Sequence, residues 1–323
     1  MVILGILCLV FVWEIFVPRS FTPQEPILYS AQKGEGQKDI AHDLKAEGII
    51  KNGFFFQFYS LISGSAGKLQ AGIYDVSPSM SIAAIIQKLV SGDIAKKKVV
   101  ILEGWDTGDI SKYADAKKLY TAKDITSAFA QDFTANFSFL KNKPKTANLE
   151  GYIFPDTYVL PIEASAQDLV KAALANFDKK VTPELRTTIT KQHKTIFQIV
   201  TMASILEKEV PSLEDKKIVA GILWKRIDNG MPLQVDATIN YITGKSDARA
   251  ASKDTKINSL YNTYKYLGLP AGPISNPGMD SLLAAVYPTK SPYWYYLSAD
   301  GTGQTVYSKT FADHSLAISK YLK

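Results

Sequence analysis

The stretch Ile196-Phe-Gln-Ile-Val-Thr-Met-Ala-Ser-Ile-Leu-Glu-Lys-Glu209 predicts an apolar helix with acidic residues at its end. Counting back from Glu207 by three or four residues meets Ala203, Val200 and Ile196, so its carboxyl shares a face with groups that exclude water. Desolvation raises the pKa of such a carboxyl. An acid that is protonated near neutral pH can protonate a leaving-group oxygen, as in glycoside cleavage. Glu207 is therefore the candidate catalytic acid; the alternative is a glutamate that points to solvent.

The composition is that of a globular protein. The chain has 323 residues, 46% of them hydrophobic and 21% charged, which is enough for two domains. The net charge is +6, but apart from Lys96–Lys98 the basic residues are scattered, so we predict no nucleic-acid partner. The only cysteine, Cys8, excludes an intramolecular disulfide.

The first seventeen residues form an apolar run that only Glu14 interrupts, followed by Pro18, Arg19 and a proline-rich stretch up to Pro26. The run is short for a spanning helix and lacks a basic flank, but no small residues mark a cleavage site after it. We expect residues 1–17 to be an uncleaved transmembrane anchor and 18–26 a linker. The alternatives are a cleaved signal peptide and a buried helix of the fold.

The next part of the chain predicts a small mixed module. A short strand is expected from Ile27 and a second strand at 69–76, with helices at 36–47, 53–62 and 81–90, ended by Gly92. Such a compact unit is able to lie against a polymer. A strand at 98–102 opens a larger region, in which helices are expected at 110–120, 122–130, 168–177 and 183–192.

The segment Leu149-Glu-Gly-Tyr-Ile-Phe-Pro-Asp-Thr-Tyr158 cannot form one regular helix and predicts an ordered loop. Its aromatic residues Tyr152, Phe154 and Tyr158 offer flat apolar surfaces to sugar rings. Glu150 and Asp156 can hold hydroxyl groups or orient the acid. The alternative is a packed turn without a binding role.

Three further segments follow the acidic helix. A helix at 213–229 is expected to stop at Gly230, and Leu233–Tyr241 reads as a strand or as the entry to a helix. If it is extended, Gln234, Asp236 and Thr238 share one side, which either lines a cleft or is the wet face of a sheet. Tyr261 and Asn262 precede a rigid irregular stretch at 268–278, then a helix at 280–285 and a β-hairpin at 293–308.

Four of these segments resemble, in the same order, the YceG-like family of membrane-anchored endolytic murein transglycosylases. They are residues 149–158, 203–209, 233–241 and 261–278. The third segment departs from the family pattern, with Val235 and Ala237 where serine and proline are common, and the N-terminus lacks the family's basic lead. The resemblance implies an α+β fold, with a LysM-like module at 27–95 that touches glycan and a mixed catalytic domain at 96–323.

The resemblance also implies a chemistry in which Glu207 acts as acid and then as base. It protonates the glycosidic oxygen between N-acetylmuramic acid and N-acetylglucosamine, and then removes a proton from the muramoyl C6 hydroxyl, so that a 1,6-anhydro end forms without water. Asp236, Asn262, Tyr261 and Tyr152 are expected to position the sugar. The other substrate-binding candidates are Gln234, Thr238, Glu150 and Asp156.

The expected setting is the bacterial plasma membrane, crossed once, with the catalytic domain outside the cytoplasm. The expected partners are peptidoglycan glycan strands and cell-wall synthesis enzymes. No cofactor or metal is expected, since His42, His193 and His314 are scattered.

Two alternatives remain. One is a hydrolytic muramidase that uses Glu207 with Asp236, Glu150 or Asp156 as a second carboxylate and leaves reducing ends. The other is a non-catalytic wall-binding scaffold, which leaves no new ends.

Overall fold

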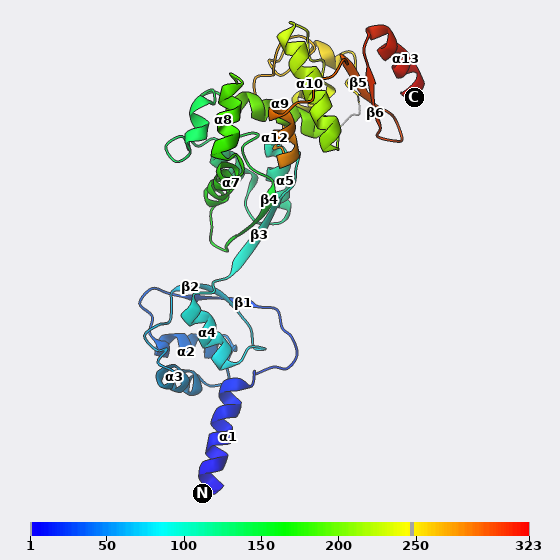
Figure 1. Ribbon diagram of the computed structural model, residues 1–323. Coiled ribbons are helices and arrows are strands. Elements are labelled where there is room, and N and C mark those ends of the chain that lie inside the picture. Colours follow the sequence, from blue (N-terminus) through cyan, green and yellow to red (C-terminus); the bar gives the residue numbers. More distant parts are fainter. Residues whose placement is uncertain (1, 246–248, 323) are drawn as a thin grey trace. The chain divides into compact units, whose positions relative to one another are not determined.

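The computed structural model describes residues 2–245 and 249–322 (Figure 1). Helices and two-stranded sheets are mixed along the chain, which confirms the predicted α+β class. The chain divides into two compact units. The N-terminal unit comprises residues 1–98 and 159–164, and the C-terminal unit comprises residues 99–158 and 165–323. The expected border between the modules, after residue 95, lies three residues before residue 98, where the first segment of the N-terminal unit ends.

The N-terminal unit packs helices against an antiparallel pair of strands. In this pair, Tyr29 lies opposite Tyr74 in the register. Both tyrosines are buried together with Leu44, Phe56 and Leu89, so strands and helices share one core. The elements of the unit are α1 (Val2–Phe16), β1 (Ile27–Ala31), α2 (Gln37–Ala46), α3 (Gly53–Ile62), β2 (Gly72–Val76) and α4 (Ile82–Ser91).

Within the described residues, no helix combines the length and the apolar character that a bilayer crossing requires.

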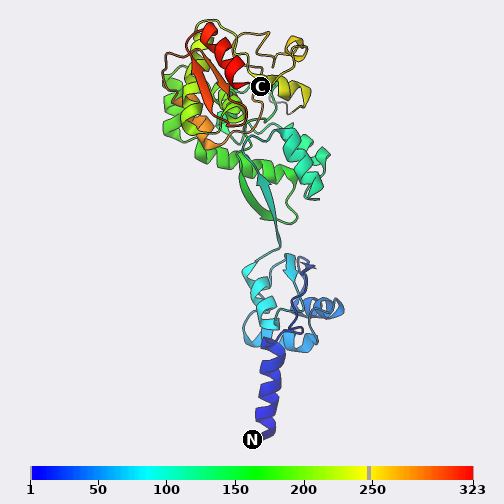
Figure 2. The same cartoon turned by 90° about the vertical axis from the view of Figure 1, so that its right-hand side faces the viewer.

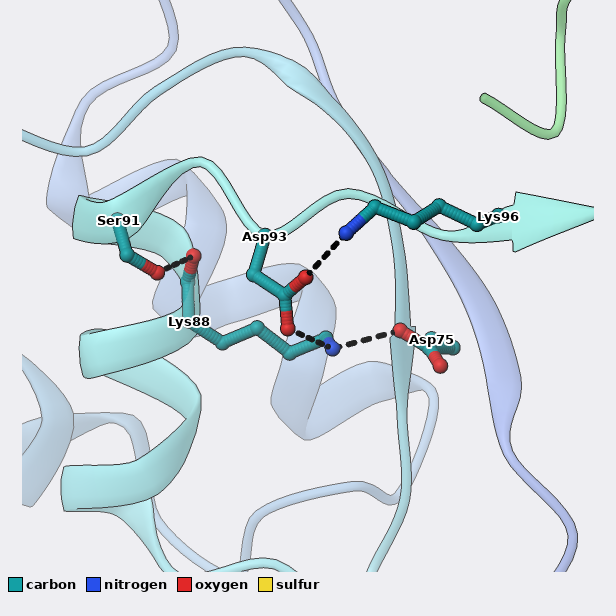
Figure 3. Close-up of polar contacts among 5 residues, drawn as sticks. All are labelled: Asp75, Lys88, Ser91, Asp93 and Lys96. Carbon is teal, nitrogen blue, oxygen red and sulfur yellow. Dashed lines mark hydrogen bonds and ion pairs between the residues drawn. The ribbon is translucent and has the colours of Figure 1, made fainter. Parts of the chain in front are cut away.

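Charged side chains connect the end of α4 to β2 and to the strand that follows (Figure 3). Lys88 Nζ lies 2.8 Å from Asp75 Oδ1 and 2.9 Å from Asp93 Oδ2, and Lys96 Nζ lies 3.1 Å from Asp93 Oδ1. The aspartates are about half exposed, so these ion pairs contribute little to stability. The chain therefore leaves α4 by a fixed turn at Gly92, which has the left-handed φ of 67°.

The C-terminal unit is built around α9 (Ile196–Glu209). Thr195 caps this helix in a reciprocal pair with Gln198, and residues 199–206 are all buried. The helix packs against α12 (Met279–Val286) and α10 (Leu213–Asp228). The other elements are β3 (Lys96–Ile101), α5 (Thr107–Ala116), α6 (Ala122–Phe129), η1 (Ser138–Asn142), β4 (Asp156–Pro161), α7 (Ala166–Lys180), α8 (Pro183–Lys191), α11 (Asp236–Thr243), η2 (Asp254–Lys256), β5 (Tyr295–Ser298), β6 (Thr305–Ser308) and α13 (Phe311–Tyr321).

Two strand pairs complete the fold. β3 pairs with β4. β5 and β6 form the predicted antiparallel hairpin, with Tyr295 opposite Ser308. The C-terminal helix α13 packs on this hairpin, and the two lie side by side in both views (Figure 1, Figure 2).

The structure decides the open readings of two segments. Leu233–Tyr241 is the entry to a helix and not a strand, because Gln234 has a left-handed φ of 55° and α11 begins at Asp236. Residues 149–155 form a packed turn in which Tyr152 and Phe154 are buried, and the segment continues into strand β4 at Asp156. Strand β4 and helix α13 were not expected from the sequence.

We predict that Gly221→Ala destabilises the C-terminal unit. Alanine in a helix interior normally stabilises by about 1 kcal/mol relative to glycine. At Gly221, however, a Cβ would lie 2.0 Å from the backbone oxygen of Thr289. The strain should lower the free energy of unfolding by about 1–3 kcal/mol, measured by urea unfolding. Gly67→Ala, where no atom lies within 4 Å of the added Cβ, is the control. An unchanged or raised stability of Gly221→Ala would refute the close contact.

Candidate active site

The end of α9 carries two glutamates, Glu207 and Glu209, on different sides of the helix. Two residues correspond to a rotation of about 200° in an α-helix, so their carboxyls meet different neighbours. Both side chains are partly exposed, although residues 199–206 before them are buried.

Glu207 is held by three donors. Lys216 Nζ lies 3.1 Å from Oε1, while the Gly278 amide and the Ser281 hydroxyl donate to Oε2 at 2.9 and 2.7 Å. The side chains of Glu207 and Lys216 are only 9% and 4% exposed. A cation and two neutral donors match an ionised carboxylate, and Gly278 is also the N-cap of α12, where negative charge is favoured. This carboxyl therefore fastens the end of α9 to α10 and α12.

Glu103 adds a second carboxyl beside Glu207. A Cβ at Gly278 would lie 1.9 Å from Glu103 Oε1, so Glu103 covers the residue that caps α12. Burial raises the pKa of Glu103, and the charge of Glu207 raises it further. A larger residue at position 278 would displace the carboxyl of Glu103.

Glu209 has the property that was expected of Glu207. Burial raises the pKa of its carboxyl to about 7, and the nearby charge of Asp236 raises this pKa while hydrogen bonds from Tyr296 and the Ala237 amide lower it. The Tyr296 hydroxyl donates to Oε2 at 2.8 Å. The residue as a whole is partly exposed, whereas its carboxyl is buried. Glu209 can thus act as a general acid near neutral pH.

Asp236 lies close enough to influence Glu209. It is the first residue of α11, it is partly exposed, and its Oδ1 accepts a hydrogen bond from the Tyr264 hydroxyl at 2.5 Å. The carboxylate of Asp236 also raises the pKa of Tyr264, so that this phenol keeps its proton and remains a donor. Asp236 was predicted from the sequence as a partner of Glu207. In the structure it lies near Glu209.

A strained turn leads into α11 and presents Gln234. The Gln234 amide donates to Thr263 O at 3.1 Å and the Val235 amide to Thr263 Oγ1 at 3.0 Å. These bonds hold the left-handed backbone of Gln234, whose side chain is exposed. Thr238 is buried, and its hydroxyl lies 3.0 Å from Thr263 Oγ1. Gln234 is thus available to a ligand, whereas Thr238 shapes the turn.

The predicted residues Tyr261 and Asn262 differ in exposure. Asn262 is buried, and its side chain donates to the backbone oxygens of Thr255 and Ile257 at 2.9 and 2.8 Å, so it organises its own loop. Tyr261 is partly exposed, and its ring lies 5.0 Å from that of Tyr241. A direct contact with a sugar is open to Tyr261 but not to Asn262.

The residues predicted in the 149–158 segment belong to other networks. Glu150 is 2% exposed; it accepts hydrogen bonds from the Thr107 hydroxyl at 2.8 Å and from Asn276 Nδ2 at 3.0 Å. Burial raises the pKa of Glu150 to about 7. Its position makes it a link between α5 and the 268–278 loop. Asp156 is exposed and accepts from Asn176 Nδ2 at 2.8 Å. Tyr152 is fully buried, so no part of its ring is open to a sugar.

The structure therefore brings Asp236 together with three residues that were not predicted for the site: Glu209, Tyr264 and Tyr296. The sequence argument for Glu207 applies equally to Glu209, because three and four residues before it stand the apolar Leu206 and Ile205. Nothing in the spacing distinguishes the two glutamates. Among residues 2–245 and 249–322, no three His, Cys, Asp or Glu side chains are grouped as a metal site requires.

Comparisons with known proteins agree with this arrangement of segments. The model of the YceG-like family matches residues 30–320. An endolytic murein transglycosylase of Bacillus subtilis strain 168 is 33% identical over 302 residues, which cover 90% of this chain and 83% of the relative. An endolytic murein transglycosylase of Streptococcus pneumoniae strain D39 is 27% identical over 339 residues, covering 97% of this chain and 61% of the relative.

A solved structure is also similar. The crystal structure of a YceG-like protein from Listeria monocytogenes superposes with a TM-score of 0.61 at 32% sequence identity. The match covers 91% of this chain and 99% of that one.

We predict that Lys216→Met destabilises the fold strongly. Removing one partner of a buried ion pair leaves an uncompensated charge and costs about 3–5 kcal/mol. Adding Glu207→Gln should restore a large part of this loss, which a double-mutant cycle by urea unfolding measures. Lys96→Met, which removes an exposed ion pair, is the matched control and should change stability by less than about 1 kcal/mol. Additive effects of Lys216→Met and Glu207→Gln would contradict the pairing.

Proposed function

The chain belongs to the YceG-like family, and we propose that it is an endolytic murein transglycosylase, a lyase that cuts the glycan strands of peptidoglycan internally. The names of its relatives and their coverage support this activity. The observation that carries the chemistry is the buried carboxyl of Glu209 at the end of α9, whose pKa of about 7 leaves it largely protonated below neutral pH.

Glu209 takes the acid and base roles in place of Glu207. It donates its proton to the oxygen between N-acetylmuramic acid and N-acetylglucosamine as the bond from that oxygen to the muramoyl C1 breaks. The resulting carboxylate removes the proton of the muramoyl C6 hydroxyl, and O6 closes on C1. The proton lost in the first step is thereby regained, and no water is consumed. Glu207 instead holds α9 against α10 and α12 through Lys216, Gly278 and Ser281.

Asp236 stabilises the positive charge that develops at the anomeric carbon. It is the carboxylate that affects the pKa of Glu209, and the Tyr264 hydroxyl holds it in place. Gln234 and Tyr261, which are at least partly exposed, position the sugar.

A hydrolytic muramidase is the main alternative, because Asp236 beside Glu209 also forms a carboxyl pair of the kind that glycosidases use. The two reactions differ in their products: a hydrolase leaves reducing ends, and a transglycosylase leaves anhydro ends that are lighter by one water. A non-catalytic scaffold leaves neither.

The N-terminal unit serves in substrate placement. The order β1, α2, α3, β2 supports a LysM-like module that touches glycan. Helix α1 is apolar and exposed, with Val2, Ile3 and Leu9 each at least 70% exposed, which supports its insertion in the plasma membrane with the catalytic unit outside the cytoplasm. Cell-wall synthesis enzymes at that surface are the expected partners, since they supply nascent strands.

Mass spectrometry of chain ends tests the reaction and its acid. The full chain is incubated with uncrosslinked peptidoglycan strands, alongside Glu209→Gln and Glu207→Gln. We expect new internal anhydromuramoyl ends from the wild type and, because the amide cannot donate a proton, a loss of at least about 10²-fold in Glu209→Gln. Folded Glu207→Gln should lose less turnover than Glu209→Gln, because it disturbs the placement of α9 but leaves the acid itself in the protein. Activity that survives in Glu209→Gln but is lost in folded Glu207→Gln would return the role to Glu207. Reducing ends would establish a hydrolase.

The pH profile of turnover should move in opposite directions in two variants. The acid must be protonated, so turnover falls as the pH rises through the pKa of Glu209, about 7. Tyr296→Phe removes a hydrogen bond that lowers this pKa, so the alkaline limb should move to higher pH. Asp236→Asn removes a charge that raises it, so the limb should move to lower pH, with a loss in maximal rate of about 10²-fold to 10⁴-fold. Limbs that stay in place in both variants would exclude Glu209 as the titrating acid.

A further inference from the structure

We propose that α3 lies in the membrane surface beside α1, so that the N-terminal unit rests partly within the lipid. This inference concerns a second apolar surface, and it rests on the proposed insertion of α1. The observation behind it is that α3 (Gly53–Ile62) contains no charged residue and places apolar side chains on its outer face.

The outer face of α3 has a helical spacing. Phe54, Phe58, Leu61 and Ile62 stand at positions i, i+4, i+7 and i+8, which share one side of a helix. Phe54, Leu61 and Ile62 are 56%, 66% and 61% exposed. The inner face is represented by Phe56 and Ser60, which are fully buried in the unit. Helix α3 is therefore packed on one side and presents a second apolar side outward.

Contacts with α1 set the level of α3 along that helix. The ring of Phe11 lies 6.1 Å from that of Phe54 and 4.9 Å from that of Phe58, and the ring of Phe16 lies 5.6 Å from that of Tyr59. Phe11 stands five residues before Phe16, the last residue of α1, which is about 7.5 Å along the axis. If α1 is immersed as far as its end, α3 starts about 7.5 Å below that level.

This depth is the one at which surface helices bind lipid. Amphipathic helices in the plane of a membrane bury their apolar face about 5–10 Å below the head groups. The polar groups Glu14, Arg19 and Lys51 line one small cavity near the end of α1, so the immersion of α1 ends close to this cavity. Within the unit, α3 lies on the side from which α1 emerges, and the β1–β2 pair lies on the other side (Figure 1, Figure 2). Lipid therefore covers the outer face of α3 continuously with α1.

Single-cysteine labelling tests this placement in the full chain. The native Cys8 lies in α1 and is exposed, so an environment-sensitive fluorophore on it reports the insertion of α1. In a Cys8→Ser background, a label on Leu61→Cys reports the environment of α3. A label on Ser30→Cys, an exposed position on β1, is the matched control. Each protein is reconstituted in phosphatidylcholine and phosphatidylglycerol vesicles that contain lipids with a quencher at a shallow acyl position.

We expect the labels at Cys8 and Leu61→Cys to be quenched and the label at Ser30→Cys to stay in water. Adding Phe54→Ser and Ile62→Ser should reduce quenching at position 61 at least about twofold, because the remaining outer face is too polar to hold lipid. Quenching at Cys8 with none at position 61 would overturn the proposal while leaving the insertion of α1 intact. No quenching at either position would overturn both. If the label at position 61 is shielded from water in the absence of vesicles, a protein partner such as a second copy covers α3, and the proposal would again be overturned.

Discussion

The buried contact of Glu207 with Lys216 and the start of α12 is the interaction on which the candidate active site depends. It joins α9, α10 and α12 at one point, with both charged side chains less than 10% exposed. The contact fixes the rotation of the last turn of α9. Because Glu209 follows two residues later, this rotation directs it to the other side, toward Tyr296 and Asp236. Glu207, which joins the three helices, and Glu209, the proposed acid, thus stand two residues apart and differ in the partners that they meet.

Those requirements follow from the partners that each carboxyl meets. A carboxylate with a lysine and two further donors is stabilised in its ionised form. Glu209 has one phenol and one amide as donors and the charge of Asp236 nearby, and burial dominates, so its pKa rises to about 7. Tyr264 keeps Asp236 in place, and Thr263 holds the strained turn that precedes it. A single protonated acid beside a fixed negative charge suits a reaction in which one group is acid and then base.

Much of this could be predicted from the sequence, and the limits are physical. The helix of residues 196–209, the hairpin and the shaped 149–158 loop follow from periodicity, turn residues and proline. The different roles of Glu207 and Glu209 cannot be predicted in this way. Apolar residues precede both glutamates at helical spacing, and the two differ only in their tertiary partners. The same reason misplaces Tyr152, Asn262 and Thr238, whose polar or aromatic character suits a site but which are buried in packing and loop bonds. Tyr296 lies 87 residues from Glu209 along the chain, beyond the reach of any local pattern.

The most direct test is a titration of the glutamate side chains by carbon NMR, with the δ-carboxyl carbons labelled. In the wild type we predict a glutamate signal that titrates with a pKa of about 7, is absent from Glu209→Gln and is retained in Glu207→Gln. Glu150, with a pKa also about 7, is identified by Glu150→Gln. If the signal near pH 7 disappeared in Glu207→Gln and persisted in Glu209→Gln, the assignment of the acid to Glu209 would be contradicted.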